Sequence, residues 1–258
     1  MSEVYQKFIS QKIVRRKKVL DYFSGDVDKT NAALRWLIES AKALRIKNGL
    51  YYFKQPDEWF KEQVSISPWL IAANAVEGSV IAYHSALRLL GTAYSETKEI
   101  QIAVGLERSR VPKGFEYQKV NYKYFRSDLS FGITEHIIAE KKIKAFDKER
   151  LILEGLMHPD KFYGMAEFLA SIEEVKWLDL DHLMDMINKY PLPTVSMRLG
   201  WLLHKYRQKW YVDDAYLHRL KTNRPEDRVF LVNRQRKGNV LEKAWNLMVP
   251  KTLLSLGK

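Results

Sequence analysis

Four polar side chains lie close together near the start of one amphipathic segment: Lys29, Thr30, Asn31 and Arg35. An asparagine amide matches the major-groove edge of adenine, and an arginine guanidinium matches that of guanine, each through two hydrogen bonds. Lysine and threonine suit phosphate oxygens, which fix position without specifying sequence. The pattern therefore predicts a helix whose first turns read duplex DNA. Thr30 and Asn31 would also suit a role in supporting the helix start, so Arg35 is the least ambiguous of the four.

The element that must carry these side chains is a helix that begins directly after Asp28. Asp28 is its predicted N-cap, because a carboxylate there can accept from the free N–H groups of the first turn. Apolar residues then recur at the spacing of one helical face. These residues are Leu34, Leu37, Ile38, Ala41 and Leu44.

A β-hairpin is predicted directly after this helix. Asn48-Gly49 separates two apolar-rich runs, and this dipeptide is a strong hairpin signal because both residues tolerate positive φ. Arg45, Lys47 and Asn48 would then lie on a wing that contacts the DNA backbone or the minor groove. A helix followed by a basic-tipped hairpin is typical of a winged helix-turn-helix. The same pair of elements also occurs in other α+β folds.

The whole chain is predicted to be α+β, with two domains. Two apolar helical stripes precede the capped helix and are separated by the basic run at residues 15–18, so residues 1–55 are expected to form a winged helix-turn-helix domain. Residues 56–258 are expected to form a larger mixed α/β domain. Its predicted strands cover residues 100–104, 117–124, 133–138 and 142–145, and its main helices cover residues 147–157, 164–170, 179–189 and 194–206.

Charge is the most informative bulk property. The 258 residues carry a formal net charge of +12, which favours a polyanionic partner, with nucleic acid ahead of membrane. The chain has no cysteine, which excludes disulfides and cysteine-ligated metal. Its apolar runs fall far short of the roughly 20 residues that span a bilayer. We expect a soluble, cytoplasmic protein without membrane association and without a cofactor.

Four stretches of the chain, taken together, resemble the AbiEi family. They are LRIKNGLYY at residues 44–52, the segment at residues 65–90 that closes on Gly91, FDKERLILEGLMHPDKFYGMAE at residues 146–167, and RLGWLL at residues 198–203. The order and spacing of these motifs carry the resemblance. The chain departs from the family pattern at Lys42-Ala43, where glycine is common before the wing, and at Glu154, where aspartate is common.

The resemblance implies a DNA-binding repressor that is also the antitoxin of a type IV, AbiE-like toxin–antitoxin system. Such a protein would bind double-stranded DNA at its own promoter and autoregulate its operon. It would counter a nucleotidyltransferase toxin without forming a stable complex with it. A winged-helix transcription factor without a toxin partner, whose C-terminal domain senses a ligand or dimerises, is the nearest alternative.

Enzymatic chemistry has weaker support, and no catalytic residue is predicted. His84-Ser85 lacks a placed acid partner and a Gly-x-Ser-x-Gly elbow. Glu149-Arg150 is expected to be an internal charge pair. The acidic residues within 173–185 would serve a metal-dependent nucleic-acid-processing enzyme, but they lack the spacing of a known metal loop. The basic tail, with Arg234, Arg236 and Lys237, is either a second polyanion contact or a solvated loop.

Overall fold

The computed structural model describes residues 2–190, 192–222, 225–233, 235 and 237–254. The chain forms two compact units. The first comprises residues 1–81, 98–128 and 135–144, and the second comprises residues 82–97, 129–134 and 145–258. The sequence-based boundary between residues 55 and 56 falls inside the first unit and stays a prediction. Within the described residues, helices are too short or too polar to cross a bilayer.

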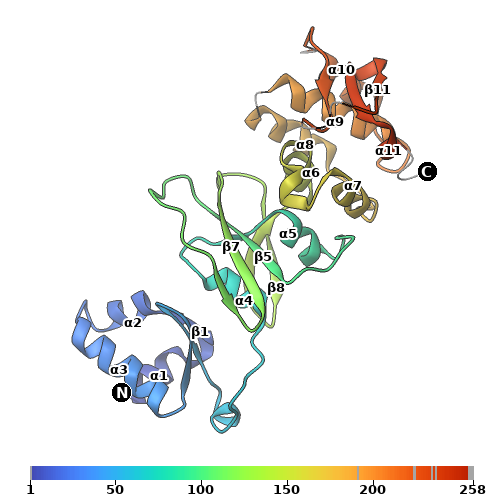
Figure 1. The fold of residues 1–258 in the computed structure, drawn as a ribbon. Coiled ribbons are helices and arrows are strands. Elements are labelled where there is room, and N and C mark those ends of the chain that lie inside the picture. The colour runs from blue at the N-terminus through green and yellow to red at the C-terminus, as the bar shows by residue number, and fades with distance from the viewer. Residues whose placement is uncertain (1, 191, 223–224, 234, 236, 255–258) are drawn as a thin grey trace. The chain divides into compact units, whose positions relative to one another are not determined.

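The first unit begins with three helices and a three-stranded sheet (Figure 1). The elements are α1 (Ser2–Phe8), β1 (Ile13–Arg15), α2 (Arg16–Tyr22), α3 (Val27–Glu39), β2 (Ala43–Lys47) and β3 (Leu50–Phe53). Strand β3 lies between β1 and β2 and is antiparallel to both. The periodicity of the first of the two predicted helical stripes, which runs through Tyr5, Phe8, Ile9 and Ile13, is wrong at its end, because Ile13 pairs with Tyr52 in the sheet.

Helix α3 differs from the prediction at both of its ends. Its N-cap is Asp26, which accepts from the Lys29 N–H at 2.9 Å, so Asp28 lies in the first turn instead. The helix ends at Glu39, and Ala41 takes a φ of 56° in the turn to β2. Leu44 consequently belongs to β2 rather than to the helical face. A non-glycine residue rarely adopts such a φ.

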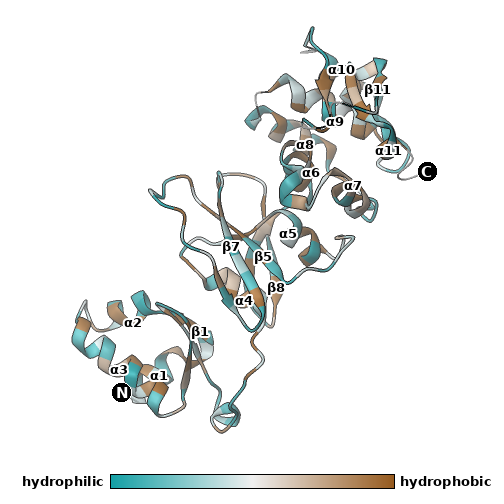
Figure 2. Ribbon diagram, viewed as in Figure 1, coloured by the Kyte–Doolittle hydropathy of each residue, from teal (hydrophilic) through white to brown (hydrophobic). Residues whose placement is uncertain are grey.

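Burial of one face holds these helices together. The core contains residues from α1, α2, α3 and the sheet, among them Phe8, Val19, Leu34 and Phe53. Figure 2 shows hydrophobic and hydrophilic residues alternating around α1 and α3, as expected for helices with one buried face. Trp36, which lies off the apolar stripe of α3, still packs against this core.

A six-stranded sheet follows, most of which lies in the first unit. Its strands are β4 (Val80–Ile81), β5 (Glu99–Val104), β6 (Phe115–Tyr117), β7 (Val120–Arg126), β8 (Ile133–Ile138) and β9 (Lys141–Phe146), in the order β6-β7-β5-β4-β9-β8. Strands β5 and β7 are parallel. The predicted strand at residues 117–124 is divided, because Gln118 and Lys119 both have positive φ and form the turn between β6 and β7. Helix α4 (Pro68–Asn74) contacts β1, β4 and β5.

The second unit is mainly helical. Its helices are α5 (Tyr83–Leu90), α6 (Lys148–Met157), α7 (Met165–Ile172), α8 (Leu180–Met186), α9 (Pro193–Lys205), α10 (Asp214–Lys221) and α11 (Lys251–Leu254). A three-stranded sheet combines β10 (Val229–Phe230), β12 (Leu247–Pro250) and β11 (Asn239–Glu242), in that order. Helix α6 contacts α5, α7, α8 and α9 and is almost wholly buried. The mixed α+β class predicted from the sequence is confirmed, and several sheets share the chain with the helices.

Candidate nucleic-acid interface

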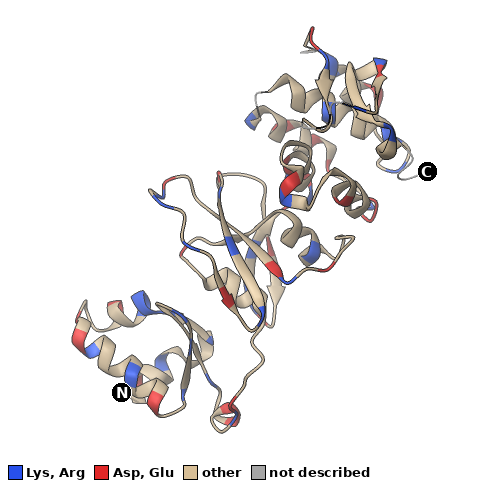
Figure 3. Ribbon diagram, in the orientation of Figure 1, with Lys and Arg blue, Asp and Glu red and all other residues tan. Residues whose placement is uncertain are grey.

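The N-terminus of α3 is fixed by Asp26. Its carboxylate accepts from the Lys29 N–H, and its second oxygen lies 3.2 Å from the Lys29 ammonium. The hydrogen bonds to Lys29 lower the pKa of Asp26. An anionic cap stabilises the positive end of the helix dipole. The cap at Asp26 therefore fixes the residue at which α3 begins. Figure 3 shows that basic and acidic residues both occur on α3.

Thr30 and Asn31 are already engaged within the protein. Thr30 is fully buried, and its hydroxyl donates to the Asp26 carbonyl at 2.6 Å. Asn31 is exposed, and its Oδ1 accepts from the Arg16 guanidinium at 2.9 Å. Arg16 is the first residue of α2, so this bond ties α2 to α3. Thr30 therefore supports the helix start, whereas Asn31 keeps its NH₂ group as a donor.

Arg35 lies on the solvent-facing side of α3, one turn after Asn31. Between them Ala32 is also exposed and contributes only a methyl group. Because Ala32 is small, the side chains on this face leave room for the α3 backbone to approach a DNA groove, with the longer Arg35 side chain beside it. Of the residues predicted from the sequence, Arg35 and Asn31 are the pair that α3 brings together on one exposed face.

Among the polar residues of the hairpin after α3, some are exposed to solvent and one is half-buried. The β2–β3 turn has Gly49 at a φ of 78°. Arg45 is exposed and donates to the Asn48 amide oxygen at 3.2 Å. Lys47 is half-buried and donates to the Tyr124 hydroxyl at 2.9 Å, and burial lowers its pKa. Arg45 and Asn48 thus remain on the surface, while Lys47 anchors the hairpin to β7.

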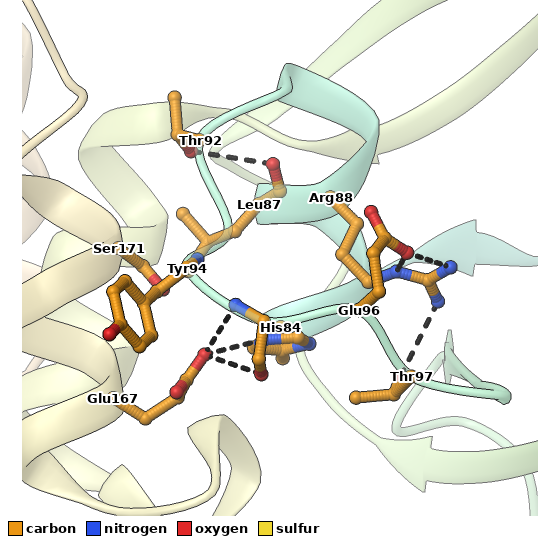
Figure 4. Close-up of polar contacts among 10 residues, drawn as sticks. His84, Leu87, Arg88, Thr92, Tyr94, Glu96, Thr97, Glu167 and Ser171 are labelled. Atoms are coloured by element: carbon orange, nitrogen blue, oxygen red, sulfur yellow. Dashed lines mark hydrogen bonds and ion pairs between the residues drawn. The ribbon is translucent and has the colours of Figure 1, made fainter.

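A second polar cluster lies in the second unit around Glu167 on α7 (Figure 4). Its Oε1 accepts from the backbone N–H and the hydroxyl of Ser95, at 2.9 and 2.7 Å. The same oxygen lies 3.3 Å from Nε2 of His84 on α5. Desolvation of this fully buried ring lowers the pKa of His84, partly offset by the carboxylate.

This cluster supplies the acid partner of His84 that sequence reasoning could not place. A nucleophilic serine needs its hydroxyl on the histidine, whereas the Ser95 hydroxyl donates to the carboxylate. The geometry suits a structural junction in which Glu167 joins α5, the segment after α5, and α7. The separation of 72 residues between Ser95 and Glu167 leaves no local signal in the sequence.

The charges of α6 form a different pairing from the one predicted. Glu149 accepts from the Asp179 N–H at 2.8 Å, and burial raises the pKa of Glu149. Arg150 instead lies 3.4 Å from Glu154, one turn along, and donates to the Phe131 carbonyl at 2.7 Å. The expected Glu149-Arg150 pair is therefore wrong, because consecutive helical residues point in different directions.

The acidic residues within 173–185 are dispersed among separate partners. Glu173 accepts from the Tyr206 hydroxyl at 2.5 Å, Asp179 caps α8, and Asp181 accepts from the Tyr216 hydroxyl at 2.8 Å. Across the described ranges of the chain, His, Asp and Glu side chains do not gather in groups of three or more that could hold a metal ion. Arg234 and Arg236 of the basic tail lie outside the described residues.

Comparison with known proteins finds a similarity of fold. No family model matches the chain, and no curated protein matches it. The crystal structure of the RV2827C protein from Mycobacterium tuberculosis is similar, with a TM-score of 0.62 and 15% sequence identity. The match covers 96% of this chain and 90% of that chain. At this identity the similarity concerns the fold alone, and it extends over both compact units.

Proposed function

We propose that the chain is a sequence-specific DNA-binding protein and that residues 1–55 form a winged helix-turn-helix. The observation that carries this proposal is the exposed face of α3, where Asn31 and Arg35 lie one turn apart ahead of a hairpin that exposes Arg45. The order helix, strand, helix, helix, strand, strand supports the same architecture, as does the central place of β3. The net charge of +12 supports a polyanionic partner.

Within this proposal the residues have different tasks. Arg35 and Asn31 read base edges in the major groove. Lys29 and the Arg45–Asn48 pair contact the sugar–phosphate backbone. Thr30 and Lys47 act from inside the protein, Thr30 by fixing the start of α3 and Lys47 by holding the hairpin on Tyr124.

We further propose that the DNA is the promoter of the protein's own operon, and that the protein is the antitoxin of an AbiE-like system. The sequence resemblance, which spans about residues 15–206, supports this second step. The partner would be a nucleotidyltransferase toxin that the protein counters in the cytoplasm without a stable complex. Co-expression tests it: growth arrest caused by a nucleotidyltransferase encoded beside this gene should be relieved by this chain and not by an unrelated winged-helix repressor.

DNA recognition is tested by mobility shift with the duplex upstream of the gene and a scrambled duplex, at two salt concentrations. The unmodified protein should prefer the upstream duplex at both. Arg35→Ala should weaken binding to the upstream duplex by about 5- to 150-fold, the equivalent of losing one bidentate base contact worth about 1–3 kcal/mol. Binding to the scrambled duplex should change much less.

Lys7→Ala is the matched control, since it removes one exposed positive charge from α1. Lys29→Ala should weaken binding to both duplexes alike and reduce the slope of log K against log salt by about 0.9. An Arg35→Ala protein that loses affinity equally for both duplexes would contradict base reading by α3.

A further inference from the structure

A small basic cavity in the first unit has no role in the DNA contacts described above. Seven residues line a volume of about 200 Å³: Gln11, Ile13, Lys18, Leu70, Asn74, Lys141 and Lys142. Three of them are lysines, and none of these seven described residues is acidic. The lysines come from α2 and β9, more than 120 positions apart in the sequence, so only the tertiary fold gathers them.

The lysine on α2 is held at the cavity by an amide. Lys18 donates to the Gln11 side-chain oxygen at 2.6 Å. An ammonium has three donors and no acceptor, so the oxygen of Gln11 must face Lys18 and its NH₂ group remains as a second donor. Burial and the neighbouring Arg15 guanidinium lower the pKa of Lys18. This ammonium would therefore gain from an anion placed beside it.

Two further lysines of the cavity lining, Lys141 and Lys142, belong to β9. Lys141 is half-buried, and Lys142 is exposed, with its ammonium 2.9 Å from the Glu135 carboxylate. That ion pair is largely solvent-exposed, and exposed pairs contribute little, so Lys142 can exchange Glu135 for another anion at small cost. Glu77, the acidic group that acts on Lys18, is itself exposed and paired with Lys17 at 3.4 Å.

We propose that this cavity binds a phosphate group. Its volume is roughly that of six or seven water molecules and lies below the roughly 300–1,000 Å³ of pockets that enclose drug-sized ligands. A tetrahedral anion with several acceptor oxygens suits a cavity lined by three lysines and by the amide of Gln11 better than a planar carboxylate does. The phosphate belongs either to a small free anion or to the DNA backbone.

Binding at this site would link two parts of the first unit. Lys18 belongs to α2, which Arg16 ties to α3 through Asn31, whereas Lys141 and Lys142 belong to the six-stranded sheet. A phosphate that contacts both would restrain α2 against the sheet. A phosphorylated effector bound in this way would change the position of α3 through α2. Phosphate binding at the cavity does not itself require that α3 bind DNA.

Isothermal titration calorimetry tests whether the ligand is a free phosphate. Inorganic phosphate is titrated into the full chain in chloride buffer of constant ionic strength. The variants are Lys18→Gln and Lys141→Gln, and the control is Lys144→Gln. Lys144 is an exposed lysine of the same strand that does not line the cavity. Saturable binding that falls at least tenfold in both cavity variants but not in the control supports a free phosphate ligand.

A parallel titration with a random duplex tests the DNA source. If the DNA backbone occupies the cavity, both cavity variants should bind the duplex more weakly than the control does. Their slope of log K against log salt should also be smaller by about 0.9. In that case, titration with inorganic phosphate should give no saturable heat. The inference is overturned if the cavity variants match Lys144→Gln in both titrations. Circular dichroism on each variant establishes that it is folded. Failure of Arg35→Ala to affect sequence preference would leave the phosphate titration unaffected, so the two proposals fail separately.

Discussion

Truncation of Glu167 should destabilise the second unit without altering its fold. In Glu167→Ala, the N–H and hydroxyl of Ser95 lose their shared acceptor, and the ring of His84 loses its carboxylate. A hydrogen bond to a charged group contributes about 1.5–3 kcal/mol. Ser95 is half-buried, so water replaces part of each bond and the lower value applies. Two such bonds give about 3 kcal/mol for Glu167→Ala.

The amide variant separates geometry from charge. Glu167→Gln retains one acceptor oxygen for Ser95 but loses the carboxylate beside His84, so about half the effect, roughly 1.5 kcal/mol, is expected. Glu174→Ala is the matched control, because Glu174 is an exposed carboxylate just beyond α7. Exposed substitutions of this kind usually stay within about 0.5 kcal/mol.

Urea denaturation followed by circular dichroism measures these differences. With a slope of about 2 kcal/mol per molar urea, Glu167→Ala should lower the midpoint of the second unit by about 1.5 M. Since the chain has two compact units, the transitions need not coincide. Hydrogen exchange at the Ser95 amide assigns the effect to this junction. An Ala variant as stable as the control refutes the junction, and equal losses in the Ala and Gln variants would assign the effect to charge alone.

Two further predictions concern packing and pH. Gly155→Ala should destabilise the protein by up to about 2 kcal/mol in the same urea assay, because the new methyl group would overlap the buried Phe168 ring. The overpacking cost of about 1–3 kcal/mol is partly offset by a helix-propensity gain of about 1 kcal/mol. A variant more stable than the unmodified protein, or a loss that Phe168→Leu does not reduce, would contradict the predicted clash. The hydrogen bond to Asp147 at 3.1 Å raises the pKa of His182 above its ordinary value of about 6.5, so its stabilising contribution is complete below about pH 6.5 and is lost as pH rises through the folded-state pKa. The difference in urea midpoint between the unmodified protein and His182→Gln should therefore be larger at pH 5.5 than at pH 8.5, and the reverse order would contradict this linkage.

Local signals in the sequence were sufficient for most elements. The turn at Gly49 and the helices at residues 148–157 and 193–205 follow from a hairpin dipeptide, a capping aspartate and apolar periodicity, all of which act within a few residues. The predicted N-cap of α3 was wrong because two aspartates lie close together at the helix start, and Asp26 rather than Asp28 caps the helix. The prediction also failed at β1, a three-residue strand that exists only because β3 is there to pair with it.

The candidate sites depended more heavily on the tertiary structure. The sequence by itself determined the net charge of +12 and the presence of Asn31 and Arg35 one helical turn apart. Only packing decided that Thr30 is buried and that Lys47 lies on Tyr124, because burial depends on elements distant in the chain. Likewise, the junction at Glu167 and the cavity with Lys18 and Lys141 join residues more than 70 positions apart. Contacts between residues so far apart leave no periodic pattern or fixed spacing in the sequence, and only the fold brings these residues together.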